Sequence, residues 1–268
     1  MIALDFSLFW CGGKISYLRF LTFKTLRYFH KNSKIDLYLS KNSNKTIHQW
    51  GAEQQDFEKD DNTKDYLDDI KKLDVNIIEM DYFGSPNFCP IFQTDLFRWW
   101  VMNVKGGFYL DSDQLILKSF ETLPLDKDFI YSQFPNRDRV QYSPTGLLGC
   151  SRDHKIAKSM MKLVPKYYSP KSYNSSGPFV FEYALLNSDV FRESNIFNAP
   201  YDYFYPISCS SDVSKIYDGS FKISTRSFAL HFYLGHPLSQ DFNRNYTPEL
   251  SKNNSDTISK FLREKNLL

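Results

Sequence analysis

The chain has 268 residues, of which 42% are hydrophobic and 24% are charged, so its composition is globular and excludes intrinsic disorder. Its 33 Lys and Arg residues against 31 Asp and Glu residues give a net charge of only +2. This balance argues against a nucleic-acid partner, because non-specific binding to phosphates needs an excess of cations.

The cysteines and the N-terminus indicate a cytoplasmic protein. No two of the cysteines form a C-x-x-C pair, which argues against a zinc site and favours a reducing compartment; they are Cys11, Cys89, Cys150 and Cys209. The first ten residues have no basic segment and contain Asp5, so they do not predict a signal peptide. Nowhere do about 18 apolar residues run together, so no transmembrane segment is predicted.

Hydrophobic periodicity predicts alternating strands and helices in the first half of the chain. Strands are expected over residues 2–10, 35–40, 75–80 and 108–110, and helices over 15–29 and 91–105. The polar segment 42–69 predicts an exposed helical insertion with apolar anchors at Trp50, Phe57, Tyr66 and Leu67. Such alternation is typical of an α/β protein with a parallel sheet, whose ligand site lies beyond the carboxyl ends of the strands.

The second half of the chain also contains both expected strands and expected helices. Strands are expected over residues 129–134, 146–150 and 228–234, and helices over 154–163, 179–186 and 255–264. No internal repeat or low-complexity linker divides the sequence. We therefore expect one domain over residues 1–268.

Two aspartates, Asp111 and Asp113, directly follow the expected strand 108–110. In an extended chain their carboxylates face the same side, and a divalent cation such as Mn²⁺ or Mg²⁺ relieves their repulsion. A D-x-D sequence alone is also common in turns, where Asp side chains cap backbone amides. The pair by itself leaves a metal site and a turn as alternatives.

One helix earlier, Asp95 and Arg98 are three residues apart and share a helical face. They could form an ion pair or reach a bound ligand together. The alternative is a surface salt bridge worth less than about 1 kcal/mol.

The block from Thr94 to Asp113 reads T-D-L-F-R-W-W-V-M-N-V-K-G-G-F-Y-L-D-S-D. It resembles the S-D-x-x-R…G-G-x-Y-x-D-x-D block of GT-A fold glycosyltransferases with a DXD sugar-binding motif, with Thr94 in place of the usual Ser. This group includes capsular-polysaccharide and initiating mannosyl transferases, globotriaosylceramide synthase and glucosylating clostridial toxins. Two shorter matches, F-W-C-G-G at 9–13 and S-G-P at 176–178, occur in the family's order.

The resemblance implies a Rossmann-like, mostly parallel central sheet flanked by helices, with a donor-binding part over about 1–120 and an acceptor side over about 121–268. It also implies a metal-dependent, retaining hexosyltransferase that uses Mn²⁺ or Mg²⁺. The donor would be a nucleotide sugar, and a UDP-sugar is favoured because the opening W-x-G-G turn is toxin-like. The acceptor would be a glycan or a lipid-linked sugar, as in polysaccharide or capsule biosynthesis.

The resemblance further assigns roles to single residues. It implies donor binding by Trp10, Asp95, Arg98, Gly107, Tyr109 and Asp111, with the Trp10 ring stacked on the base. It implies catalytic roles for Arg98, Asp111 and Asp113, metal binding by Asp113 and His231, and an acceptor side at Gly177, Pro178 and Glu182. Trp10 could instead be a core residue, and a helical Glu182 is usually solvated.

The His231 assignment rests on Ala229-Leu230-His231, which is similar to a late A-x-H motif of the family. The Trp-containing continuation is missing and F-Y-L-G-H-P replaces it, which puts the third metal ligand in doubt. His231 could equally be a hydrogen-bonded histidine at a strand edge. His236 is the next candidate for the third metal ligand.

Two further patterns have a functional and a structural interpretation. The cations Lys14, Arg19, Lys24, Arg27, Lys31 and Lys34 could bring the protein to the inner face of an anionic membrane, or form a solvated face. The aromatic residues Tyr167, Tyr168, Tyr173, Tyr201, Tyr203, Phe204 and Tyr205 could line an acceptor groove or pack in the core.

Two other functions compete with transfer. Haloacid-dehalogenase-like phosphohydrolases also place D-x-D after a strand, but here Leu115 stands where Thr or Val is expected, and no later G-D-x-x-x-D follows. The second alternative is a non-catalytic nucleotide-sugar or glycan-binding module, although nothing in the sequence marks a loss of turnover.

Overall fold

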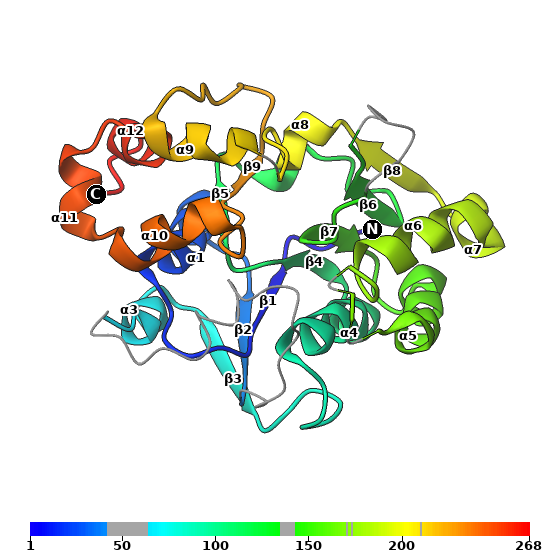
Figure 1. Cartoon of the computed structure of the whole chain (residues 1–268). Helices are drawn as coiled ribbons and strands as arrows, with labels where there is room; N and C mark the ends of the chain where they lie inside the picture. The colour runs from blue at the N-terminus through cyan, green and yellow to red at the C-terminus, as the bar shows by residue number, and fades with distance from the viewer. Residues whose placement is uncertain (42–63, 135–142, 170, 173, 210) are drawn as a thin grey trace.

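The structure, a computed structural model, describes residues 1–41, 64–134, 143–169, 171–172, 174–209 and 211–268 (Figure 1). The expected anchors Trp50 and Phe57 lie outside the described residues, as does Tyr173. Of the other two anchors, Tyr66 is buried and its ring packs against Tyr17. It directly precedes the short helix α3, Leu67–Lys71.

A seven-stranded sheet with the order β3-β2-β1-β4-β7-β6-β8 forms the centre of the molecule (Figure 1). The strands are β1 Phe6–Trp10, β2 Ile35–Ser40, β3 Asn76–Met80, β4 Gly107–Leu110, β6 Phe129–Ser132, β7 Leu147–Cys150 and β8 Ile196–Ala199. Strand β7 runs antiparallel to its neighbours β4 and β6, and the other neighbouring pairs are parallel. The expected α/β class with a mostly parallel sheet is confirmed.

The sequence of strand β1 is almost entirely apolar because both faces of the strand are buried. Successive side chains of a strand point to opposite faces, so both faces of a buried strand must be apolar. Phe6, Leu8 and Trp10 enter one hydrophobic core, and Phe9 enters the other. Helix α1 packs in the first core, and helices α4, α5 and α6 pack in the second.

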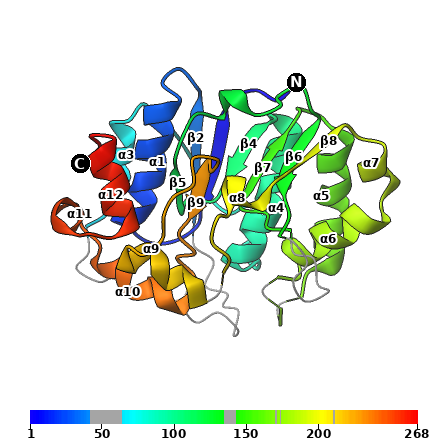
Figure 2. The same ribbon diagram turned by 90° about the horizontal axis from the view of Figure 1, so that it is seen from above.

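The long helices begin at the residues that cap them. Ser16 accepts from the Arg19 N–H at the start of α1, Tyr17–Phe29. Cys89 caps α4, Pro90–Val104, whose first residue is proline, a residue that suits the first turn of a helix. Figure 2 shows α1 and α12 toward the β2 side of the sheet and α5 to α7 toward the β8 side. The remaining helices are α5 Lys155–Tyr167, α6 Pro178–Asn187, α7 Asp189–Arg192, α8 Tyr201–Phe204, α9 Ser214–Asp218, α10 Pro237–Asn245, α11 Pro248–Asn253 and α12 Thr257–Glu264.

A second, two-stranded sheet pairs β5, Gln114–Ile116, antiparallel with β9, Ala229–His231. In this register Gln114 lies opposite His231, so a residue late in the chain is placed beside the end of the D-x-D sequence. The sequence analysis predicted β9 as part of a longer strand over 228–234 and missed β5. Three residues are too few to show a periodic pattern.

Two of the six cations of residues 14–34, Arg19 and Arg27, do not belong to a solvated or membrane-facing surface. Arg19 is buried, with an exposed fraction of 6%. Arg27 donates hydrogen bonds to five backbone carbonyls around the end of α1, and this role is structural. Within the described chain, every helix is too short or too polar to cross a lipid bilayer.

Candidate active site

A cavity of about 750 Å³ lies beyond the carboxyl ends of β1 and β4, where the parallel sheet predicts a ligand site. This volume suits a small-molecule ligand. Its lining comes from β1, α1, α4, the chain after β4, and β9, and includes Trp10, Arg19, Asp95, Arg98, Asp111, Ser112, Asp113 and His231. The two sequence blocks that suggested a site therefore meet at one place.

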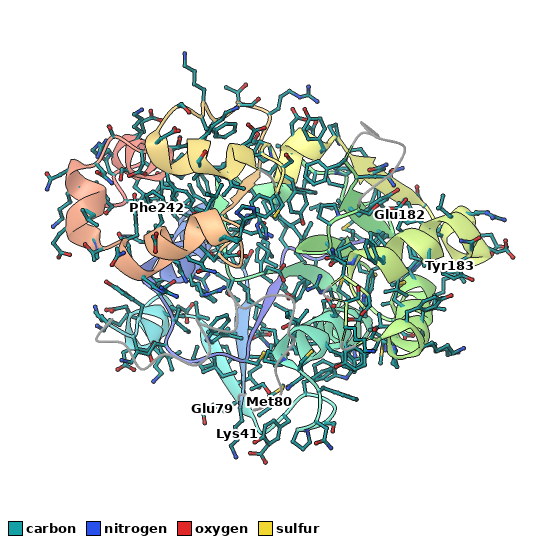
Figure 3. The ribbon with its side chains drawn as sticks, viewed as in Figure 1. Lys41, Glu79, Met80, Glu182, Tyr183 and Phe242 are labelled. Atoms are coloured by element: carbon teal, nitrogen blue, oxygen red, sulfur yellow. The ribbon has the colours of Figure 1, made fainter. Side chains whose placement is uncertain are left out.

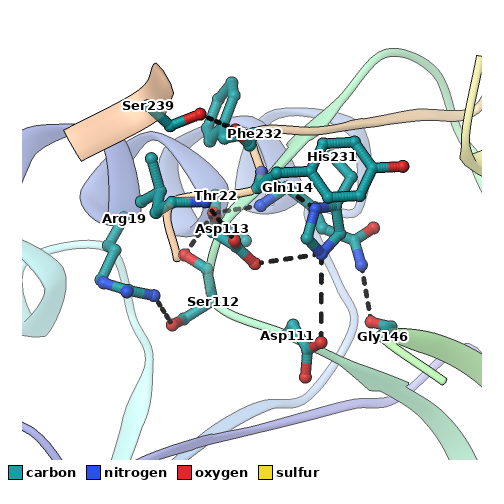
Figure 4. Close-up of polar contacts among 12 residues, drawn as sticks. Arg19, Thr22, Asp111, Ser112, Asp113, Gln114, Gly146, His231, Phe232 and Ser239 are labelled. Atoms are coloured by element: carbon teal, nitrogen blue, oxygen red, sulfur yellow. Dashed lines mark hydrogen bonds and ion pairs between the residues drawn. The ribbon is translucent and has the colours of Figure 1, made fainter. Parts of the chain in front are cut away.

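Asp111, Asp113 and His231 converge on one point at the cavity (Figure 4). One ligand atom from each lies within 4.8 Å of the others. His231 Nε2 is 3.3 Å from Asp113 Oδ1 and 4.0 Å from Asp111 Oδ2. The Tyr233 N–H donates to His231 Nδ1 at 3.0 Å, so Nε2 faces the carboxylates and, in a neutral imidazole, carries the proton that a metal ion would displace. Two carboxylates and one imidazole in this arrangement are a donor set that suits Mn²⁺ or Mg²⁺.

One backbone N–H and one tyrosine hydroxyl hold the two aspartates in place. The Leu234 N–H donates to Asp113 Oδ2 at 3.1 Å, and the Tyr109 hydroxyl donates to Asp111 Oδ1 at 2.7 Å. Burial opposes the charge on Asp111, but the Arg98 guanidinium, helped by His231 and Tyr109, outweighs it and lowers the pKa of Asp111 below its ordinary value. Asp111 is therefore a carboxylate.

Asp95 and Arg98 form a buried ion pair, and the surface salt-bridge interpretation is wrong. Their exposed fractions are 3% and 5%. Arg98 Nη2 lies 3.1 Å from Asp95 Oδ1 and 3.5 Å from Asp111 Oδ1, and Nη1 donates to Thr145 Oγ1. Ser176 donates to Asp95 Oδ2 at 2.7 Å, yet burial still raises the pKa of Asp95 to about 6.

This chain of contacts contains three carboxylates, those of Asp95, Asp111 and Asp113, but one guanidinium, that of Arg98. Buried charges are stable when they are paired or bind a cation. The surplus of negative charge therefore fits a divalent cation at Asp111, Asp113 and His231.

Gly146 is a site residue that the sequence analysis missed. A Cβ atom on it would lie 2.5 Å from Asp111 Oδ2 and 3.3 Å from His231 Nε2. Its carbonyl accepts from the Asp111 N–H at 2.7 Å and from Gln114 Nε2 at 2.6 Å. Only a residue without a side chain lets the backbone pack this closely against the cluster. Its position at the start of an apolar strand was the available signal.

The other residues predicted to bind the donor differ in whether they line the cavity. Trp10 lines the cavity, its indole donates to the Gly13 carbonyl at 3.0 Å, and it also packs in a core, so both interpretations hold in part. Tyr109 is fully buried and reaches the site through Asp111. Gly107 starts β4 with a φ of +82°, and a Cβ there would lie 2.5 Å from the Asp5 carbonyl oxygen. It does not line the cavity.

On the predicted acceptor side, Pro178 lines the cavity, and a Cβ on Gly177 would lie 2.9 Å from Asp95 Oδ1. Glu182, labelled on α6 in Figure 3, is not among the residues that line the cavity. It is half-buried and accepts from Ser143 Oγ at 2.6 Å and from Gln133 Nε2 at 3.2 Å. The expectation of a solvated Glu182 is therefore wrong.

The aromatic residues divide between the two interpretations. Tyr201 and Tyr205 line the cavity. Tyr168 stacks on Phe92 with ring centroids 4.0 Å apart, so packing explains it. His236, the alternative to His231, caps α10 and lines the cavity, but it lies outside the Asp111, Asp113 and His231 cluster. Packing also accounts for the rings of Tyr203 and Phe204. Tyr167 is exposed, contacts the ring of Tyr183 and does not line the cavity, so neither interpretation holds for it.

Two family models match the chain. "Glycosyltransferase sugar-binding region containing DXD motif" matches residues 29–130, and "Alpha 1,4-glycosyltransferase conserved region" matches residues 149–257. The first includes both aspartates, and the second includes His231. The two matches thus cover all three members of the cluster. No match was found among curated proteins.

Solved structures give distant likenesses. PaToxG glycosyltransferase is 20% identical over 71% of this chain and 73% of its own, with a TM-score of 0.48. Galactosyltransferase LgtC, in complex with donor and acceptor sugar analogues, is 12% identical over 98% and 96%, with a TM-score of 0.42. The WbbM bifunctional glycosyltransferase is 11% identical over 92% of this chain and 50% of its own, with a TM-score of 0.45.

Proposed function

Because the chain is a glycosyltransferase of the DXD group, we propose that it transfers a hexose from a UDP-sugar to a hydroxyl of a glycan or lipid-linked sugar. The convergence of Asp111, Asp113 and His231 beside the buried Arg98 carries this proposal. In the transfer, the C1–O bond to the diphosphate breaks and its electron pair stays on the phosphate oxygen. C1 then bonds to the acceptor oxygen on the same face, and the acceptor proton passes to the departing diphosphate.

Asp111, Asp113 and His231 would hold Mn²⁺ or Mg²⁺. The ion, when bound, supplies positive charge that stabilises the departing diphosphate. Tyr109 keeps Asp111 oriented through its hydroxyl, and the Gly146 backbone leaves no room for another side chain beside the cluster.

Asp95 and Arg98 would orient the hexose. Both are buried at the cavity wall and restrained by Ser176 and Thr145, so little conformational entropy is lost when they bind sugar hydroxyls. Trp10 would stack on the uracil, which contributes about 1 to 3 kcal/mol per base.

The acceptor would enter from the side of the cavity formed by Pro178, Tyr201 and Tyr205. Tyrosine rings suit sugar faces because they combine an apolar surface with a hydroxyl. Residues 1–120 and 121–268 both line the cavity, which supports a division into a donor-binding and an acceptor part. Glu182 would act on this side only through Ser143 and Gln133.

We place the reaction in the cytoplasm, in polysaccharide or capsule biosynthesis. No disulfide joins any of the four cysteines, all of which are described. This agrees with a reducing compartment.

The competing functions have less support. The phosphohydrolase alternative is overturned by the two family models, which describe glycosyltransferases. A binding module without turnover would not need the charged cluster to be complete.

A donor screen tests the proposal. Thermal shifts of the purified protein with UDP- and GDP-sugars and Mn²⁺ identify the donor, because a ligand of the native state raises its apparent stability. The release of nucleoside diphosphate and sugar transfer to glycan acceptors are then measured with and without a chelator. Stabilisation by a UDP-hexose and transfer that stops on chelation are expected. Transfer at an unchanged rate after chelation would refute the metal-dependent reaction.

A further inference from the structure

Arg19 is a buried cation that forms no ion pair with any residue of the described part of the chain. Its exposed fraction is 6%, and it lines the cavity. Its Nη1 donates to Ser112 Oγ at 3.0 Å (Figure 4), and the structure describes no ion pair for it. Burying an unpaired charge is costly, so such a group is expected to have an anionic ligand.

The surroundings of Arg19 indicate where that ligand lies. The guanidinium carbon is 4.0 Å from the centre of the Trp10 ring. Its hydrogen-bond partner Ser112 is the middle residue of the Asp-Ser-Asp sequence, so the neighbouring carboxylate is that of Asp113. Arg19 thus connects the ring proposed for the base with the cluster proposed for the metal.

A guanidinium has five N–H donors in a planar fork, which suits phosphate oxygens. One of these donors is used by Ser112. None of the Arg19 nitrogens is among the fully buried polar atoms without a partner, and Arg19 lines the cavity, so a ligand in the cavity can reach its remaining donors.

We infer that Arg19 binds the diphosphate of the sugar nucleotide, an inference that rests on the proposed function. In a sugar nucleotide the diphosphate lies between the base and the hexose, and Arg19 lies between Trp10 and the Asp111–Asp113 segment. As the C1–O bond breaks, the electron pair and its negative charge go to the diphosphate, where the guanidinium stabilises them. Arg19 is therefore a catalytic residue of the α1 helix.

The alternative is that Arg19 only holds Trp10 and Ser112 in place. The two roles differ in how binding depends on phosphate. A phosphate contact affects UDP and leaves uridine unchanged, whereas a misplaced Trp10 weakens both ligands equally.

The experiment compares uridine and UDP, each with Mn²⁺, on the wild-type chain and on variants. Titration calorimetry measures UDP, and ligand-detected NMR measures the weaker uridine. For Arg19→Met we expect the Kd of UDP to rise about 10- to 100-fold, with uridine unchanged within about twofold. Arg19→Lys should fall between Arg19→Met and the wild type, because it keeps the charge but loses the fork.

Lys24→Met is the matched control, since it removes a cation from the same helix outside the cavity lining. It should bind both ligands as the wild type does. Equal losses of uridine and UDP in Arg19→Met, or no loss of either, would overturn the inference while leaving the proposed function intact. A wild-type chain that binds neither UDP nor GDP would overturn both.

Discussion

The sheet has a buried charge cluster at each end, and the two clusters are balanced differently. At the amino ends of the strands, Asp36 of β2 contacts Lys105 Nζ and accepts from Asn76 Nδ2 at 2.8 Å. At the carboxyl ends, beside a cavity, Asp95 and Asp111 share the Arg98 guanidinium, and Asp113 contacts His231. The first, which we call the closed cluster, is neutralised by the protein itself, and the second, the open cluster, keeps a charge for a ligand. Balance within the protein distinguishes a structural ion pair from a binding site built of the same residue types.

The largest effect is expected from Asp113→Asn. The amide can still accept from the Leu234 N–H, but it removes a charged ligand of the proposed cation. We expect kcat/KM for transfer to fall about 1,000-fold. The free energy of unfolding should change by less than about 1 kcal/mol, since repulsion between carboxylates is relieved. Initial rates and urea denaturation measure the two quantities.

Asp189→Asn is the control for this variant, because Asp189 is an exposed carboxylate paired with Arg192. It should alter neither quantity. If Asp113→Asn lost stability in proportion to its activity, the open cluster would be a structural element, and the contrast between the two ends of the sheet would fail.

Asp36→Asn, at the closed cluster, should lower stability and leave activity unchanged, the opposite of Asp113→Asn. The substitution keeps the shape and the contact with Asn76 but leaves the Lys105 ammonium uncompensated. We expect the free energy of unfolding to fall by about 3 kcal/mol, at the low end for a buried pair because Lys105 is one-third exposed. Transfer per folded molecule should be unchanged.

A double variant sharpens this test. Removing both charges with Asp36→Asn and Lys105→Met should recover much of the lost stability, because no buried charge is then left unpaired. A double variant whose losses simply add would contradict the interpretation as a neutralised pair.

His30 tests the closed end through pH. It lies at the end of α1, with its ring 4.6 Å from Phe6 and its Nε2 accepting from the Phe120 N–H. Burial, with a smaller contribution from Arg27, lowers the pKa of His30 from 6.5 to about 4. Below pH 6.5 the unfolded chain takes up a proton that the native chain resists, so stability falls as the pH falls toward 4.

Between pH 7 and pH 5 this difference costs about 2 kcal/mol of the free energy of unfolding. His30→Phe removes the titrating group, so its loss over the same interval should be smaller by that amount. Urea denaturation of both proteins at the two pH values measures the difference. Parallel losses in the two proteins would show that His30 is not the source.

The fold was largely predictable because its long elements carry local signals. The expected strand 35–40 is confirmed, and the expected helix 91–105 corresponds to α4. The three-residue strands β5 and β9 carry no comparable signal. Their pairing depends on packing between segments more than 110 residues apart, which no local pattern contains.

The candidate site, too, was predictable only where its signals are local in the sequence. The D-x-D sequence and the spacing of Asp95 and Arg98 were visible because neighbouring residues of one strand or helix carry them. The close approach of Gly146 to Asp111 and the burial of Arg19 were not, since both follow from contacts across the fold. The role of a residue could not be predicted where it depends on contacts with residues far away in the sequence.

The smallest effect is expected from Ser176→Ala, which tests how far the open cluster depends on support from outside it. Ser176 Oγ donates to Asp95 Oδ2 at 2.7 Å, and Asp95 in turn contacts Arg98. Without that bond Asp95 is less restrained, so we expect kcat to fall about 10-fold while KM for the donor stays within about twofold.

The neighbouring Ser175→Ala is the matched control, because within the described residues the Ser175 hydroxyl hydrogen-bonds only to the backbone of Ser169. It should lower the free energy of unfolding by about 1 kcal/mol and leave kcat unchanged. A structural role for Ser176 would make the two serines alike, with a loss of stability and no change in kcat. A fall in kcat confined to Ser176→Ala would instead show that Ser176, which touches no substrate, holds the open cluster in its working geometry. A site with spare charge requires such support, whereas a neutralised ion pair does not.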